Sequence, residues 1–200
     1  MIDIDLLLTL GATYKKVSRG EIVFREGSTA LFYHQLVEGK IKWFNTDEEG
    51  KEFIQHIIQP GECFGELPLF DGSPYAANAI AEEDSILIRL HRSTFLQFLK
   101  DCPDVHFAFS RLLAGRLRFK FMLANELSCH SPGHRVITLI DYLKSNKKNV
   151  CTECSKLLLT RQQIASMTGL RVETVIRVMK ELEEKKMITI EKGKVYLAMR

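Results

Sequence analysis

Two oppositely charged residues near the C-terminus, Glu173 and Arg177, have the types and spacing of a base-reading pair. They stand four positions apart, so one helix would present both on the same face. Arginine donates two hydrogen bonds to guanine O6 and N7, and glutamate accepts one from cytosine N4. Val172 and Ile176 offer apolar contact to a thymine methyl group. The alternative is an ordinary surface ion pair, which stabilises a helix by only about 0.2–0.5 kcal/mol.

The residues around this pair predict a helix-turn-helix. Thr160 and Gln163 have the spacing of a capping box, which begins a short helix, and Gly169 ends it. A second helix is expected over 171–184. Small or apolar residues stand where two crossing helices require them, at Ala165, Gly169 and Val175. The second helix is predicted to bury Val175, Val178, Met179 and Leu182.

A wing and a set of exposed residues complete the predicted DNA contact. Residues 187–198 read as two strands joined by a turn at Lys192 and Gly193. A recognition helix enters the major groove by its N-terminal end, whereas basic residues on flanking elements contact phosphates. The predicted DNA-binding residues are Thr160, Arg161, Gln162, Arg171, Val172, Glu173, Ile176, Arg177, Lys180, Lys192 and Lys194.

The distribution of charge favours a nucleic-acid partner for one part of the chain. Residues 131–200 contain 14 Lys and Arg against 7 Asp and Glu, which gives +7. Residues 1–130 contain 14 against 18, which gives −4. A basic segment attached to an acidic body suits contact with phosphates, although a solvated charged surface gives the same count.

A second candidate site lies in the stretch GECFGELPLFDGSPYAANA, residues 61–79. Its glycines suit a tight turn around a phosphate, and Glu66 suits a hydrogen bond to a sugar hydroxyl. However, no Lys or Arg occurs between Lys51 and Arg89. The stretch therefore resembles a phosphate cradle without its cation.

The segments that carry this stretch are strand-like. Residues 12–92 contain short apolar or alternating runs, and Gly39, Gly50 and Gly61 follow one another at intervals of 11. Regular short strands separated by turns predict a β-sandwich or barrel.

One long helix is expected over 103–129. Its apolar residues cover a wider arc than a helix on one surface needs, so it is expected to contact both the β domain and a second copy of itself. Arg116 and Lys120 lie inside this arc. These two cations either extend from the edge of the contact or meet an anionic group.

Other features exclude several classes of protein. No run of about 18 apolar residues is present to span a bilayer, and the N-terminal MIDIDLLLTL lacks the basic residues of a signal peptide, so a cytoplasmic protein is expected. Five irregularly spaced cysteines argue against a disulfide framework. Cys151 and Cys154 have half the spacing of a zinc site, with a plain loop as the alternative, and no metal site is predicted. No catalytic constellation is present, so no enzyme is expected.

The combined pattern resembles the bacterial family of the cyclic-AMP receptor protein and the fumarate–nitrate regulator, the Crp/Fnr family. The segments that carry it include VSRGEIVFREGSTALFYHQLVEGKIKWF, GECFGELPLF and TRQQIASMTGLRVETVIRVMKEL. The resemblance implies an α+β fold with a cyclic-nucleotide-binding-like β-roll over 1–102, a dimerisation helix and hinge over 103–130, and a winged helix-turn-helix over 131–200. It also implies a homodimeric transcription regulator that binds a near-palindromic double-stranded operator, with RNA polymerase as a partner.

The resemblance also bears on the effector. Cyclic-nucleotide binders of this family have an Arg-Ser pair where Tyr75 and Ala76 stand, and a Thr-Ser pair where Lys120 and Phe121 stand. Cyclic-AMP binding in the usual mode is therefore not expected, because the bidentate contact to phosphate is missing. Glu66 is instead expected to pair with Arg116. The predicted effector pocket comprises Gly65, Glu66, Leu67, Tyr75, Ala76, Arg116, Lys120 and Phe121.

Alternatives remain open for the effector and for the output. A different small acid, a haem held by a histidine, and constitutive activity without a ligand are all considered. No cysteine precedes Cys63, so an iron–sulfur site near the N-terminus is not expected. The alternative function is a ligand-binding β-roll module that acts through a protein partner.

Overall fold

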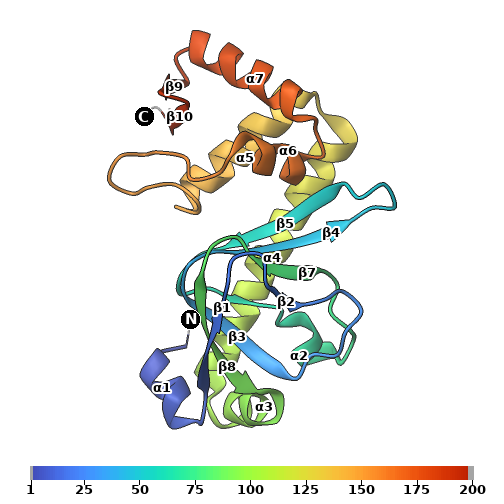
Figure 1. Cartoon of the computed structure of the whole chain (residues 1–200), viewed down its shortest axis with the longest axis vertical. Helices are drawn as coiled ribbons and strands as arrows, with labels where there is room; N and C mark the ends of the chain where they lie inside the picture. Colours follow the sequence, from blue (N-terminus) through green and yellow to red (C-terminus); the bar gives the residue numbers. More distant parts are fainter. Residues whose placement is uncertain (1, 198–200) are drawn as a thin grey trace. The chain divides into compact units, whose positions relative to one another are not determined.

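The computed structural model describes residues 2–197, apart from the side chain of Cys129. The chain divides into two compact units, Met1–Gly115 and Arg116–Arg200 (Figure 1). The α+β fold expected from the sequence is confirmed, with β-sheets in the first unit and mainly helices in the second.

The first unit is built on two four-stranded antiparallel sheets. One has the strand order β1-β8-β3-β6, and the other β2-β7-β4-β5. The strands are β1 (Thr13–Val17), β2 (Ile22–Phe24), β3 (Phe32–Glu38), β4 (Ile41–Thr46), β5 (Glu52–Ile58), β6 (Cys63–Phe64), β7 (Asn78–Ala81) and β8 (Ser85–His91). The helices of this unit are α1 (Ile4–Thr9), α2 (Leu67–Asp71), α3 (Arg92–Asp101) and the first half of α4 (Pro103–Cys129).

The regularly spaced glycines make the turns of these sheets, as predicted. Gly39, between β3 and β4, has φ +94°, and a Cβ at this position would collide with Ser85. Only glycine adopts this backbone conformation without strain and also leaves room for β8. Gly50, in the turn between β4 and β5, has φ +81°.

An aromatic cluster joins the helices of the first unit to its sheet. The rings of Tyr33 and Phe95 stack with their centroids 4.7 Å apart, and Phe109 of α4 meets Phe95 edge-on at 5.3 Å. Aromatic pairs in such geometry contribute about 0.5–1.5 kcal/mol beyond their buried area. The first half of α4 is therefore anchored on the β domain, as its apolar arc predicts.

A separate stripe along α4 remains exposed. Phe107, Leu117 and Phe121 are each more than half exposed, and Ala114 and Ala124 are exposed between and beyond them. With Ser110 and Ser128 these positions follow alternating steps of three and four residues, which is the spacing of a coiled-coil seam.

The second unit packs three helices and a hairpin around an aliphatic core. These elements are α5 (Pro132–Ser145), α6 (Arg161–Thr168), α7 (Val172–Glu184), β9 (Ile188–Glu191) and β10 (Lys194–Leu197). The second half of α4 joins them through Phe119, whose ring stacks on Tyr142 of α5 at 4.3 Å. Arg135 of α5 donates hydrogen bonds to the carbonyls of Leu127 and His130, which satisfies acceptors left open at the end of α4.

Within residues 2–197, no helix combines the length and the apolar composition that crossing a membrane requires.

Candidate nucleic-acid interface and effector pocket

Helix α6 begins at the predicted capping box. The Thr160 hydroxyl accepts a hydrogen bond from the Gln163 backbone N–H at 3.1 Å, and the Gln163 side-chain oxygen accepts one from the Thr160 N–H at 2.8 Å. Two backbone donors at the helix start are thereby satisfied, which fixes where α6 begins.

The turn between α6 and α7 also follows the prediction. Gly169 has φ +66° and closes α6, with the Leu170 N–H donating to the Ala165 carbonyl at 3.0 Å. A Cβ on Gly169 would lie 3.3 Å from Leu127 Cδ2. Ala165 and Val175 are completely buried on the facing sides of the two helices. The small side chain of Ala165 leaves room for the two helices to cross.

Helix α7 turns one face into the core and the other to solvent. Its buried residues are the four predicted ones, Val175, Val178, Met179 and Leu182. Arg171, Glu173, Ile176, Arg177 and Lys180 are exposed, and Val172 is half-buried. The N-terminal half of α7 therefore offers to solvent the side chains that could read base edges.

Glu173 and Arg177 do not form the surface ion pair considered as the alternative. No ion pair joins their side chains in the described part of the chain, and both are exposed. Their hydrogen-bonding groups therefore face solvent from the same side of α7.

The wing lies against the start of α6. Strands β9 and β10 pair antiparallel, and Lys192 and Gly193 in their turn have φ +47° and +77°. Arg161 donates a hydrogen bond to the Gly193 carbonyl at 2.7 Å, so it positions the wing in addition to its predicted role at phosphate. Lys192 and Lys194 are exposed.

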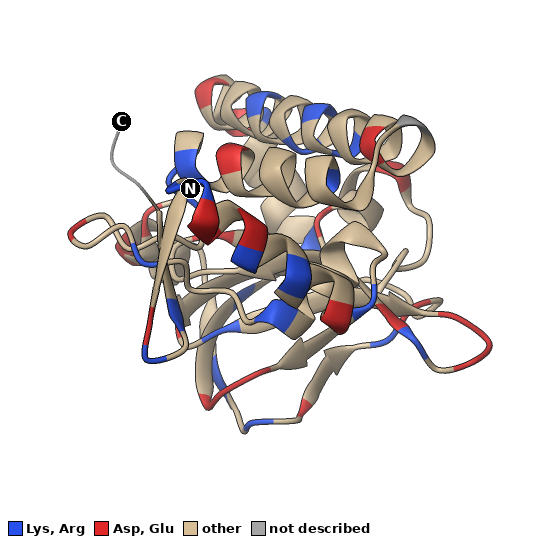
Figure 2. Ribbon diagram, turned by 90° about the horizontal axis from the view of Figure 1, so that it is seen from above, with Lys and Arg blue, Asp and Glu red and all other residues tan. Residues whose placement is uncertain are grey.

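The predicted DNA-binding residues thus come from three neighbouring elements. Thr160 caps α6, and Arg161 and Gln162 begin it. Arg171, Val172, Glu173, Ile176 and Arg177 lie at or in the first half of α7, Lys180 lies farther along this helix, and Lys192 and Lys194 lie on the wing. Figure 2 shows Lys and Arg interspersed with Asp and Glu on the helices. For contact with DNA, the positions of individual cations therefore matter more than the net charge of the domain.

The phosphate-cradle stretch is folded around a close aromatic contact. Gly65 follows β6 with φ +66°, and a Cβ at this position would lie 2.6 Å from Phe24 and 2.9 Å from Tyr75. Only glycine therefore fits. Tyr75 stacks on Phe24 with centroids 3.7 Å apart and an interplanar angle of 5°.

Tyr75 is a core residue of this cluster. Its ring is buried, its N–H donates to the Ser28 carbonyl, and its carbonyl accepts from the Gly27 N–H. Burial raises the pKa of Tyr75 to about 12. Sequence reasoning missed the partner of this ring, Phe24, and the two further rings that lie near Phe24, those of Phe64 and His34. They are distant in sequence, and no short-range pattern signals their contact.

His34 is held neutral in this cluster. Burial, together with the smaller effect of the positive charges of Lys15 and Arg89, lowers its pKa to about 3. Its ring lies 5.5 Å from Phe64 and 5.8 Å from Phe24, centroid to centroid.

The other predicted pocket residues differ in exposure. Glu66, at the start of α2, is completely buried, whereas Leu67 is partly exposed. Ala76 is exposed, and its carbonyl accepts a hydrogen bond from the Asn45 side chain at 2.8 Å.

Three predicted pocket residues lie on the part of α4 that belongs to the second unit. Burial, followed by the charge of Arg116, lowers the pKa of Lys120 to about 8. Phe121 is 67% exposed and belongs to the coiled-coil stripe. The pairing of Glu66 with Arg116 and a shared pocket with Tyr75 stay predictions.

The cysteine pair lies in the loop before α6. Cys151 and Cys154 are free thiols, and the Cys154 backbone N–H lowers the pKa of the Cys151 thiol by hydrogen bonding to it. In the described residues, no group of three potential metal ligands includes either cysteine.

Comparison with known proteins assigns both units. Residues 14–102 match the family described as the cyclic nucleotide-binding domain, and residues 134–199 match the Crp-like helix-turn-helix domain. The chain belongs to the Crp/Fnr family of transcription regulators. It is therefore a DNA-binding regulator of the Crp/Fnr type, and the family is one of regulators, not of enzymes.

Relatives extend this assignment over most of the chain. The cyclic AMP receptor protein of Thermus thermophilus is 29% identical over 178 residues, which is 88% of this chain and 80% of that protein. The cAMP-activated global transcriptional regulator CRP of Haemophilus influenzae is 27% identical over 92% of this chain and 83% of its own. The structure of FixK2 from Bradyrhizobium japonicum has the same fold, with a TM-score of 0.81, 22% identity, and coverage of 94% of this chain and 93% of that one.

Proposed function

We propose that this Crp/Fnr regulator binds a near-palindromic operator as a homodimer and does not use cyclic AMP in the mode of the receptor proteins it resembles. The observation that carries the DNA-reading part is the exposed N-terminal face of α7, where Glu173 and Arg177 stand side by side without an ion pair between them. In this proposal the two side chains read adjacent bases, and Val172 and Ile176 contact thymine methyl groups.

The exposed stripe of α4 supports the homodimer. Members of this family bind DNA as dimers. Leu117 and Phe121 place large apolar side chains in solvent at coiled-coil spacing, with Ala114 and Ala124 small enough for close approach. A second copy of α4 carries the same stripe with the same spacing, so two copies of this helix can pack against each other. The proposed division is a β-roll over 1–102, a dimerisation helix and hinge over 103–130, and a DNA-binding domain over 131–200.

The packing of Tyr75 supports independence from cyclic AMP. The residue aligned with the phosphate-binding arginine of the family is here an aromatic ring, stacked on Phe24 and against Gly65. A phosphate at this place would displace a packed ring and would find no cation between residues 52 and 88. The anion would therefore be desolvated without compensation.

A different acidic effector is the second candidate, and Lys120 favours it. Burial, followed by the like charge of Arg116, lowers the pKa of Lys120 to about 8, and a bound acid would raise this pKa again by favouring the charged amine. Another protein of this fold responds to a different ligand. It is the c-di-GMP responsive global regulator CLP of Xanthomonas campestris, with a TM-score of 0.76. In this alternative the β-roll acts as a ligand-binding module with a protein partner, for which RNA polymerase remains the proposed candidate.

Fluorescence anisotropy with fragments of the source genome tests the proposal. We expect a few fragments to bind far more tightly than the rest, and every affinity to fall steeply with salt as lysines and arginines release counterions from phosphates. Added cyclic AMP should change neither the affinity nor the melting temperature. Equal binding to all fragments would contradict sequence-specific regulation, and tighter binding with cyclic AMP would contradict the effector part.

A further inference from the structure

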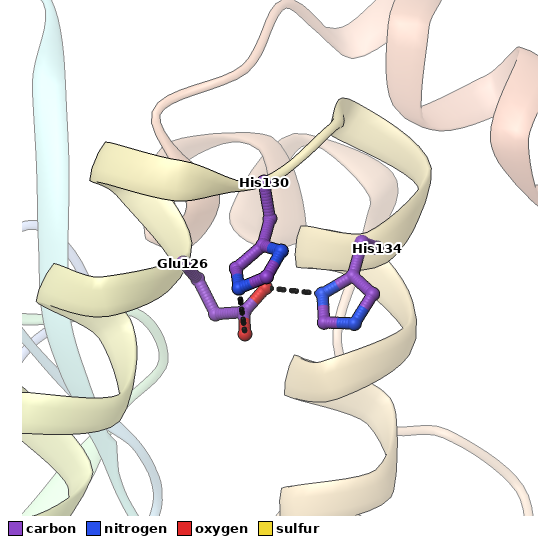
Figure 3. A group of neighbouring side chains, drawn as sticks. All are labelled: Glu126, His130 and His134. Carbon is purple, nitrogen blue, oxygen red and sulfur yellow. Dashed lines mark hydrogen bonds and ion pairs between the residues drawn. The ribbon is translucent and has the colours of Figure 1, made fainter.

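Three potential metal ligands gather where α4 ends and α5 begins. Glu126 lies in the last turn of α4, His130 in the connection and His134 in the first turn of α5, and their side chains point toward one another (Figure 3). One ligand atom from each lies within 4.8 Å of the other two. All three belong to the second unit.

The distances between these atoms fit a small cation. Glu126 Oε2 lies 2.6 Å from His134 Nδ1, and Glu126 Oε1 lies 3.9 Å from His130 Nε2. Bonds of about 2.0–2.1 Å to a tetrahedral Zn²⁺ place neighbouring ligand atoms about 3.3 Å apart. The two observed distances, which involve different oxygens of Glu126, lie on either side of this value, so binding would require rotations of these side chains around the ion.

The local fold holds the three residues in place. The Glu126 side chain is 7% exposed, so its carboxylate is anchored within the unit. The two imidazole rings stack with centroids 4.2 Å apart, and Arg135 holds the His130 carbonyl at 3.1 Å. A buried carboxylate requires compensating partners, and the two histidines are the ones it faces in Figure 3.

We propose that Glu126, His130 and His134 bind a divalent transition-metal ion of the zinc class. Imidazole nitrogen and carboxylate oxygen are preferred ligands of Zn²⁺ and Co²⁺. Three protein ligands leave the fourth position to water or to another donor. The ion would bridge the end of α4 and the start of α5, and would stabilise the connection between them.

This site gives the regulator a means of sensing metal, an inference that rests on the proposed function. Helix α5 shares its core with the helix-turn-helix. A bound ion would hold the connection between α4 and α5 in one conformation, and the orientation of the helix-turn-helix relative to α4 would follow this conformation. Because coupling is reciprocal, operator DNA would change metal affinity by the same factor as metal changes DNA affinity.

Titration with Co²⁺ tests the site directly, without DNA. The full-length protein, free of any histidine tag and stripped with chelator, is titrated while the visible d–d absorption of tetrahedral Co²⁺ is recorded. We expect saturation at one equivalent and displacement of Co²⁺ by Zn²⁺. Glu126→Gln and His134→Ala should each weaken binding by at least ~10-fold.

Two controls separate this site from others on the chain. His106→Ala removes an exposed histidine of α4 outside the cluster and should bind Co²⁺ as the wild type does. The Cys151→Ser/Cys154→Ser variant should also keep full binding and an unchanged spectrum. Circular dichroism confirms that every variant is folded. The proposal would be overturned if the wild type bound Co²⁺ no more tightly than Glu126→Gln, or if the cysteine variant lost Co²⁺ binding. The three residues would then form only a hydrogen-bonded carboxylate–imidazole group.

Discussion

In the proposed function, single residues decide whether the β domain can accept cyclic AMP. Tyr75 stands at the position of a phosphate-binding arginine, but its ring packs face to face on Phe24 at 3.7 Å. Gly65 permits this contact, because any side chain there would overlap both rings. Tyr75, which the sequence places in a candidate ligand cradle, is thus part of the hydrophobic core.

Shortening Tyr75 is therefore expected to destabilise the protein. Tyr75→Ala should lower the free energy of unfolding by about 3 kcal/mol, because it leaves a cavity beside Phe24. Tyr75→Phe should cost less than about 1 kcal/mol, since no hydrogen bond reaches the hydroxyl within residues 2–197. Urea denaturation measures both. Tyr14→Ala, at a half-exposed ring, is the control, and an equal loss there would contradict the packing role of Tyr75.

His34 is expected to make stability depend on pH. Its folded pKa of about 3 lies below its unfolded value, so the folded state binds fewer protons. The stabilisation is complete above about pH 6.5 and is lost as pH falls toward 3, by roughly 3 kcal/mol between pH 7 and pH 4.

His34→Phe keeps an aromatic ring but cannot be protonated. Denaturation series across this pH range should show a shallower acid slope for this variant than for the wild type. His106→Phe should retain the wild-type slope, because His106 is exposed. Identical slopes in all three proteins would contradict a lowered pKa for His34 in the folded state.

At the scale of elements, short-range signals predicted the DNA-binding part well. The capping box at Thr160 and Gln163, the stop at Gly169 and the four buried residues of α7 all lie where local patterns placed them. Each is a contact within a few residues, which a sequence displays directly.

Other elements lacked such signals. Strands β6 and β7 and helix α2 are two to five residues long, too short for a period to show. Helix α3 was not predicted either, although it is ten residues long. The Tyr75 cluster and the Glu126–His130–His134 group depend on tertiary contacts, the latter on a helix break that turns His134 back toward α4.

The elements of the DNA-binding domain should divide the work of recognition. Arg177→Ala on α7 should cost about 1–3 kcal/mol at the preferred operator and relax base preference, because a bidentate base contact is lost. Lys194→Ala on the wing should weaken all sequences alike and reduce the salt slope by about one phosphate contact. Anisotropy titrations at several salt concentrations separate the two, and a uniform loss for both variants would contradict base reading by Arg177.

At the scale of the whole molecule, the proposed function depends on a second copy of the chain. The exposed stripe of α4 places Leu117 and Phe121 in solvent at coiled-coil spacing. Association would bury this stripe and bring two recognition helices under one symmetry axis.

A charge on the stripe should separate the two copies. Leu117→Glu should shift the protein from dimer to monomer in analytical ultracentrifugation and abolish tight operator binding, because a carboxylate would be buried in the seam. Ala108→Glu adds the same charge at an exposed position of α4 off the stripe and should remain dimeric. A dimer that survives Leu117→Glu would place the subunit contact elsewhere.

The most direct test of the account is selection of binding sites from random duplex DNA, without cyclic AMP. Two α7 helices related by a two-fold axis predict an inverted repeat whose half-site centres lie about 34 Å apart. The same selection with Arg177→Ala should lose the bases that this residue reads. A single asymmetric half-site, or no enrichment in the absence of cyclic AMP, would contradict the account.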